Sequence, residues 1–212
     1  MVEGRCMKCK AQVEMQDVKE VVTKNNISIW TESFGESSNL AILLIAGAHA
    51  PSTFWPDFFC KKLADAGYFV IRYDHRDIGY SSHFPVTEDI NKVPYTLADL
   101  AVDALNVLDA SNVSKAYVIG HSMGGSIAQY LTVKHSDRVI ATISISVNIS
   151  KQIHQHPKYK ATMQELLKNK PTGDFNKDWN GWFKSWRLLH GDILIDERKR
   201  LICHMWLMMR LQ

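Results

Sequence analysis

The chain has no long apolar segment and only a small excess of positive charge. No apolar run approaches the roughly 18 residues that a membrane-spanning helix needs, and the N-terminal residues lack the apolar stretch of a secretory signal. Lys and Arg number 25 against 22 Asp and Glu, so the net charge of +3 is too small to indicate a nucleic-acid surface. We therefore expect a cytoplasmic protein without nucleic-acid or membrane partners.

Cysteine is scarce, and the absence of a secretory signal favours free thiols over disulfides. Cys6 and Cys9 form a C-x-x-C pair that resembles the leading half of a small zinc ribbon. A structural zinc site needs four ligands, and no second pair follows. The preferred interpretation is an ordinary solvent-facing tail, and we expect neither a metal site nor a cofactor. Cys60 and Cys203 lie within apolar helical patterns and are predicted to be buried small residues.

The 212 residues contain 46% hydrophobic and 22% charged residues, as is usual for a globular protein. Apolar runs that predict buried strands alternate with patterns that predict helices. This alternation predicts an α/β fold with a mostly parallel sheet flanked by helices. A hairpin of 18–23 and 27–31 is expected to precede it. The predicted buried strands are 40–46, 68–73, 116–119 and 139–145, and the predicted helices are 54–66, 97–108 and 123–135.

Three regions follow from this pattern. Residues 1–24 are expected to be an N-terminal appendage carrying the C-x-x-C pair, and residues 25–150 the α/β core. Residues 151–212 contain only helical patterns and are expected to form part of a helical cap. Within them, a stripe of aromatic residues over 179–186 is predicted to pack against the core, with lining of an apolar substrate pocket as the alternative.

The segment from Gly120 to Gly124 matches G-x-S-x-G, with Ser122 at its centre, and lies between a predicted strand and a predicted helix. In that setting the motif forms a strained turn that lifts the serine hydroxyl above the edge of the sheet. The flanking glycines let the chain turn without Cβ clashes, and Gly125 allows the helix to approach closely. The N-terminus of the helix favours negative charge, so the N–H of Met123 can hold an oxyanion.

Three segments together resemble the α/β-hydrolase fold. They are Ala46-Gly47-Ala48, the loop Asp74-His75-Arg76-Asp77-Ile78-Gly79-Tyr80-Ser81, and the serine turn. The segment from Ile27 to about Ile149 is most similar to esterases of the aclacinomycin-type methylesterase branch. Where that family usually has a histidine this chain has Ala46, and where it has a loop glycine this chain has Asp77. Asp tolerates the left-handed backbone region better than most residues.

The resemblance implies carboxylic ester hydrolysis through an acyl-enzyme on Ser122, with a small-molecule ester as substrate and no cofactor. By position, the N–H groups of Ala48 and Met123 form the oxyanion hole. Turn and pocket residues are expected to be Gly47, His49, Gly120, His121, Gly124 and Gly125. His121 is expected to point into the top of the sheet, away from the serine hydroxyl.

The acid and the histidine of the triad are not identifiable. In this family they follow the serine along the chain. No later buried strand ends in Asp, and His190-Gly191-Asp192 precedes an apolar run instead of following one. Asp74 is expected to brace its own loop. The chain therefore looks truncated within the cap, and its incomplete sheet edge is expected to favour self-association. The alternatives are a non-catalytic pseudo-hydrolase or binding domain, and a truncated or fused reading frame without independent activity.

Overall fold

The computed structural model describes residues 18–23, 26–85 and 94–147, the backbone of β1 (Glu3–Arg5) and β2 (Gln12–Glu14), and scattered positions from 161 to 184. The chain divides into two compact units, Met1–Val147 with Leu207–Gln212 and Asn148–Trp206. The description below concerns the first unit. Several predictions lie outside the described residues: those for Cys6, Cys9, Cys203, the aromatic stripe over 179–186 and His190-Gly191-Asp192.

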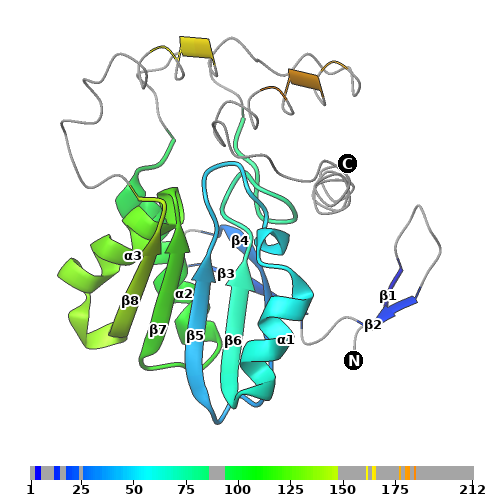
Figure 1. Ribbon diagram of the computed structural model, residues 1–212, viewed down its shortest axis with the longest axis vertical. Coiled ribbons are helices and arrows are strands. Elements are labelled where there is room, and N and C mark those ends of the chain that lie inside the picture. The colour runs from blue at the N-terminus through cyan, green and yellow to red at the C-terminus, as the bar shows by residue number, and fades with distance from the viewer. Residues whose placement is uncertain are drawn as a thin grey trace. The chain divides into compact units, whose positions relative to one another are not determined.

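A six-stranded sheet forms the centre of this unit (Figure 1). Two antiparallel pairings join β3, β4 and β6, and the remaining neighbours are parallel. The predicted α/β fold and the predicted hairpin are confirmed. The sheet already begins at Val18, whereas the sequence placed the start of the core at residue 25. In spatial order the strands are β3 (Val18–Val22), β4 (Ser28–Phe34), β6 (Tyr68–Tyr73), β5 (Leu40–Ile45), β7 (Ala116–His121) and β8 (Val139–Ile145).

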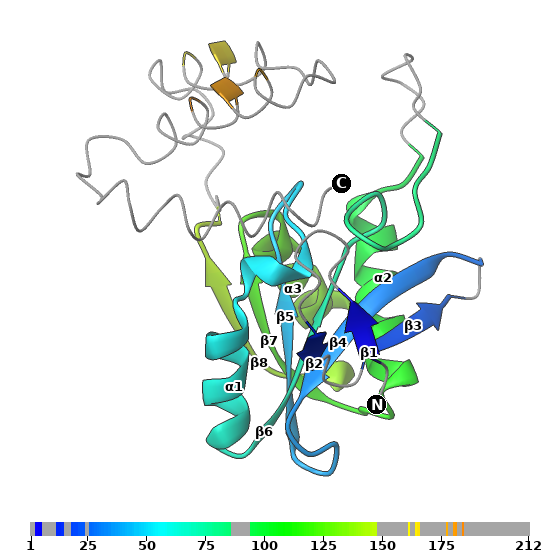
Figure 2. The same cartoon turned by 90° about the vertical axis from the view of Figure 1, so that its right-hand side faces the viewer.

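Three helices cover the sheet. The helix α1 (Asp57–Asp65) lies on one face, and α2 (Leu97–Ala110) and α3 (Met123–Lys134) lie on the other (Figure 2). A capping box begins α2, since the N–H of Asp99 donates to Thr96 Oγ1 and the Asp99 carboxylate accepts from the N–H of Thr96. Short 3₁₀ turns, η1 (Ser52–Phe54) and η2 (Ser136–Arg138), precede α1 and β8.

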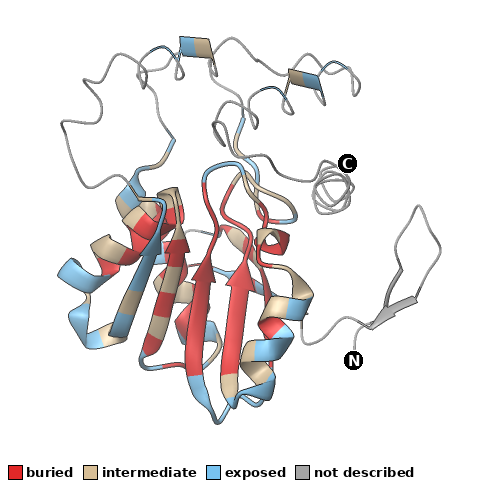
Figure 3. Cartoon of the chain, in the orientation of Figure 1, coloured by how far each residue is buried: buried red, intermediate tan, exposed pale blue. Residues whose placement is uncertain are grey.

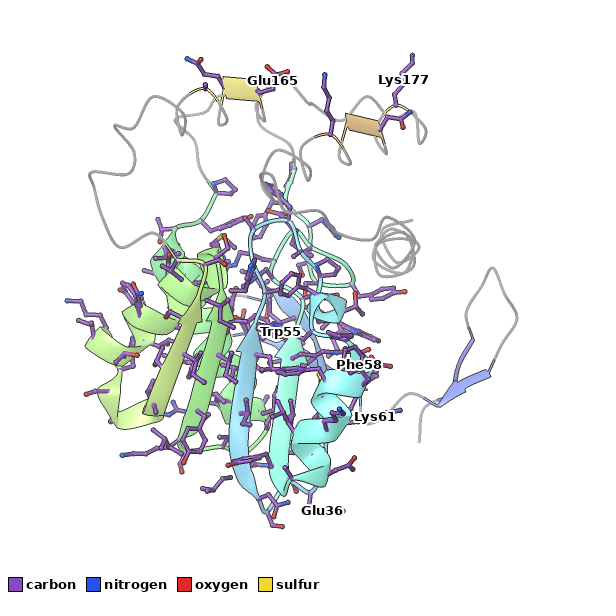
Figure 4. All side chains as sticks on the ribbon, in the orientation of Figure 1. Glu36, Trp55, Phe58, Lys61, Glu165 and Lys177 are labelled. Carbon is purple, nitrogen blue, oxygen red and sulfur yellow. The ribbon has the colours of Figure 1, made fainter. Side chains whose placement is uncertain are left out.

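Side chains pack on both faces of the central strands, which are buried along most of their length (Figure 3). Leu43 and Ile45 of β5 pack with α2 and α3, and Leu44 packs on the α1 side with Trp55, which lies beside β5 and β6 (Figure 4). This two-sided packing explains the uninterrupted apolar run of β5. Cys60 is fully buried as predicted, and burial raises the pKa of its thiol to about 11.

The strand β8 is not buried on both faces like the central strands, so the prediction that it is buried is wrong. Ile143 is 56% exposed and Ile145 is 41% exposed. In the part of the chain that the structure describes, β8 pairs only with β7 and is covered only by α3 on one face. On the face opposite α3, apolar residues pair across β7 and β8, as in the pair Ile119 and Ile143. An apolar run does not reveal how many neighbours a strand has.

Candidate active site

Ser122 occupies the junction between β7 and α3, at the carboxyl end of the strand. Its backbone has a positive φ of 53° and a ψ of −119°, a conformation that residues other than glycine rarely adopt. The N–H of Ser122 donates to Ile145 O at 2.9 Å, and the carbonyl of Ser122 accepts from the N–H of Gly125 at 2.9 Å. The chain therefore forms the expected strand, sharp turn and helix, held by its own backbone.

The glycines around Ser122 allow three pieces of backbone to meet at this turn. A Cβ atom on Gly120 would lie 2.2 Å from Gly124 O, and one on Gly124 would lie 2.3 Å from Ile45 O. A Cβ atom on Gly125 would lie 2.1 Å from Val147 Cγ2. Because such distances are too short for non-bonded atoms, any larger residue at these positions would push α3 away from the sheet.

The loop that follows β5 lies directly against this turn. A Cβ atom on Gly47 would lie 3.3 Å from Ser122 Cβ and 3.3 Å from His121 Nδ1. The parallel pairing of Ile45 with Gly120 places the ends of the two strands at the same level, so the segments that leave them become neighbours.

Ala48 and His49 form the tip of that loop. Both are exposed, and His49 has a positive φ of 58° within a turn closed by the N–H of Ala50 donating to Gly47 O at 3.3 Å. The exposed tip is open to a ligand. The roles predicted for them, a backbone oxyanion donor at Ala48 and a pocket side chain at His49, stay predictions.

His121 precedes the serine but lies against an aromatic ring on the α1 side of the sheet. Its imidazole packs on Phe54 with 4.6 Å between ring centroids. Burial lowers the pKa of His121, and its Nδ1 has no hydrogen-bond partner within the described residues. The ring therefore packs beside the turn on the α1 side of the sheet.

The loop that follows β6 is built around Asp74. One carboxylate oxygen accepts from the N–H of Ser52 at 2.6 Å, and the other accepts from the N–H of Tyr80 at 3.0 Å. Gly79 has a positive φ of 58°, and a Cβ atom there would lie 2.1 Å from Asp74 Oδ2. The prediction that Asp74 braces its own loop is confirmed.

Asp77 stands in that loop where the family usually has glycine. Its φ is 65°, and its Oδ1 accepts from the N–H of Phe84 at 2.6 Å. Asp77 thus keeps the left-handed backbone that glycine would adopt freely, and the hydrogen bond of its carboxylate offsets the strain. The expectation that Asp is tolerated here is confirmed.

A buried ion pair beneath this loop was missed from the sequence. Two nitrogens of Arg76 donate to the two oxygens of Asp103 at 2.7 Å each, and both side chains are buried. The guanidinium also lies over the ring of Tyr95, with 5.2 Å to its centroid. The available signal was Asp103 itself, an acid on the apolar stripe of α2.

His75 is buried beside the strand ends. Its Nε2 forms a hydrogen bond with Ala46 O at 3.0 Å, and burial lowers its pKa.

No general base is positioned at Ser122 within the described residues. Among them, no hydrogen bond reaches its hydroxyl, and no group of three or more His, Cys, Asp or Glu side chains gathers in metal-binding geometry. His154, His156, His190 and His204 lie outside the described residues. A search of the described helices finds none long and apolar enough to cross a membrane.

Comparison with known proteins agrees with this geometry. Residues 40–178 match the family model of the alpha/beta hydrolase fold. The chain is 38% identical over 152 residues to rhodomycin D methylesterase DauP of Streptomyces sp. (strain C5), and 36% identical over 152 residues to rhodomycin D methylesterase DnrP of Streptomyces peucetius. Each alignment covers 72% of this chain and 48% of the relative, so the chain spans about half the length of these relatives.

Among solved structures, a hydrolase from Pseudomonas aeruginosa PA01 superposes with a TM-score of 0.64. The two sequences are 23% identical, and the alignment covers 88% of this chain and 66% of that protein. This likeness concerns the fold alone.

Proposed function

The chain belongs to the α/β-hydrolase family, and from that premise we propose that it is a serine hydrolase acting on carboxylic esters through an acyl-enzyme on Ser122. The observation that carries this proposal is the strained backbone of Ser122 between β7 and α3. A backbone with φ 53° and ψ −119° is free of strain only for glycine, so a serine is kept here at a cost in backbone strain. A serine there places a hydroxyl at the carboxyl end of the sheet, where ligands bind in open α/β folds.

The proposed chemistry has two steps. In the first, Ser122 Oγ attacks the ester carbonyl, the alcohol leaves, and the acyl group is bound to the serine. In the second step, water attacks the acyl carbon, the carboxylic acid leaves, and the hydroxyl of Ser122 is restored. The N–H groups of Ala48 and Met123 would hold the oxyanion of each tetrahedral intermediate. Met123 is the first residue of α3, where the helix favours negative charge.

The substrate is proposed to be a small-molecule ester, and the reaction needs no cofactor. Two relatives are named as methylesterases, so methyl esters are the first class to test. Which groups supply the acid and the base of the triad is not assigned. A non-catalytic binding domain is the second candidate, supported by the hydroxyl of Ser122, which lacks a partner among the described residues.

Acylation of the intact chain by p-nitrophenyl acetate tests the proposal. We expect Ser122-dependent release of p-nitrophenolate and an acetyl group on Ser122, detected by intact-mass and peptide mass spectrometry. Ser122→Ala should lose both signals. Release that is equal in the two proteins would overturn the proposal, and binding of a methyl ester without any acylation would favour the binding domain.

A further inference from the structure

We propose that His75 is a positioning residue for the oxyanion loop, defined here as residues 46–50. The inference rests on the proposed function, because it assigns the loop to transition-state binding. His75 follows β6, and Ala46 follows β5, the parallel neighbour of β6. From the end of one strand the imidazole reaches the end of the next, where its Nε2 lies 3.0 Å from Ala46 O.

The environment of the ring fixes its protonation state. His75 is 1% exposed, and burial lowers its pKa although the hydrogen bond to Ala46 and the nearby carboxylates of Asp103 and Asp74 act in the opposite direction. The ring is therefore neutral. Because a carbonyl oxygen only accepts, the proton is on Nε2, which donates to Ala46 O.

The other ring nitrogen, Nδ1, makes no comparable contact, so the hydrogen bond of Nε2 to Ala46 O is what distinguishes a histidine at this position. Nδ1 is buried and has no partner within the described residues. A leucine would fill the same space without leaving a buried nitrogen unpaired, an arrangement that proteins generally avoid. The histidine therefore leaves Nδ1 without a hydrogen bond and makes one hydrogen bond through Nε2, to Ala46 O.

The bond to Ala46 O controls the direction of the oxyanion loop. The same carbonyl faces Gly124 of α3, where a Cβ atom would lie 2.4 Å from it, so it is confined between His75 and the helix. The peptide is planar, so fixing this carbonyl also fixes the N–H of Gly47. Gly47 in turn lies against Ser122 Cβ, and Ala48, the proposed donor, is the next residue.

Phosphorylation of Ser122 by diethyl p-nitrophenyl phosphate measures this positioning in the intact chain. The serine oxygen forms a bond to phosphorus, p-nitrophenolate leaves, and the hydroxyl proton passes to solvent. The phosphoryl oxygen of the adduct occupies the place of the oxyanion. Three variants are compared with the wild type: His75→Leu, which removes the donor; His75→Gln, which keeps one; and His83→Leu. His83 is a matched control, because its Nε2 lies 3.1 Å from Gly79 O in an exposed position.

We expect His75→Leu to lower the limiting phosphorylation rate about ten- to a hundredfold while the half-saturating concentration stays constant. His75→Gln should recover most of the rate, and His83→Leu should behave as the wild type. The ³¹P resonance of the adduct should move in His75→Leu and not in His75→Gln. A lower stability without these changes would show a merely structural role and overturn the inference.

The outcomes separate the inference from the proposed function. If the wild type reacts no faster than Ser122→Ala, the proposed function fails. If the wild type reacts at Ser122 and His75→Leu reacts equally fast, only the positioning role fails. Should His75→Leu not fold, ¹⁵N NMR of the wild type decides: a proton on Nε2 coupled to the Ala46 carbonyl supports the inference, and a proton on Nδ1 overturns it.

Discussion

Two of the turns that leave the carboxyl edge of the sheet with a non-glycine residue at positive φ treat that residue differently. In the loop after β6, the side chain of Asp77 accepts a hydrogen bond from the N–H of Phe84. In the turn after β7, no described residue bonds to the hydroxyl of Ser122. Strain at Asp77 is offset by its own side chain, whereas strain at Ser122 is offset only by backbone packing. The loop after β6 is braced by its own side chain, whereas the turn after β7 leaves a hydroxyl without a partner among the described residues.

The largest expected effect concerns the free hydroxyl. Loss of the base in a serine protease triad lowers kcat by about 10⁶, or about 8 kcal/mol of barrier. With no base at Ser122 among the described residues, we expect turnover of p-nitrophenyl acetate below about 1 s⁻¹. Steady-state assays of the wild type and Ser122→Ala measure it. A Ser122-dependent kcat in the usual range of about 1–10³ s⁻¹ would show that His49, His204 or a second chain supplies the base.

The second effect concerns the rigidity of the braced loop. Asp103→Ala leaves Arg76 buried and unpaired, which should lower the free energy of unfolding by about 3–5 kcal/mol. Asp109→Ala is the matched control, because it breaks the more exposed pair with Arg138 and should cost less than about 1 kcal/mol. Urea unfolding of both variants gives the two values, and equal losses would contradict the distinction.

The third effect is a dependence of stability on pH at His75. Its pKa is lowered in the folded state from an ordinary value of 6.5, so the unfolded chain binds more protons, and stability falls as pH drops below 6.5. At pH 5.5 the loss is up to about 1.4 kcal/mol. His75→Gln should flatten this part of the profile in urea titrations at pH 7.5 and 5.5. An unchanged slope would show that the ring already titrates normally when folded.

The smallest effect tests the strain directly. Ser122→Gly should raise the free energy of unfolding by about 1 kcal/mol, because glycine adopts this backbone freely and no side-chain bond is lost. Asp77→Gly should give no gain, since removal of the carboxylate also removes the bond to the N–H of Phe84. Thermal unfolding of the two variants in parallel is sufficient, and an equal gain at both positions would refute the comparison.

Much of this architecture could be predicted from local patterns. The apolar run of β5 indicated a strand covered on both faces, and the helical pattern over 97–108 indicated α2. The G-x-S-x-G motif identified the turn at Ser122, because the close approach of Gly120 to Gly124 is a contact within a few residues. Such features depend on neighbours in the chain and are therefore visible in the sequence.

Features that depend on distant partners could not be predicted in the same way. The pair of Arg76 with Asp103 joins a loop to a helix, and the contact of His75 with Ala46 joins two strand ends. The exposure of β8 depends on what lies beside it, which its composition does not encode. These contacts depend on the register of the strands and on how deeply each residue is buried. Neither property follows from the residue type alone.

The hydrogen bond from the N–H of Ser122 to Ile145 O links the turn after β7 to the last residue of β8, an edge strand among those described. Edge strands open locally far more often than central ones. We therefore expect the amide of Ser122 to exchange its hydrogen at the rate at which the end of β8 frays, although the serine lies between a strand and a helix. Hydrogen exchange at this one amide would then report the local opening of β8.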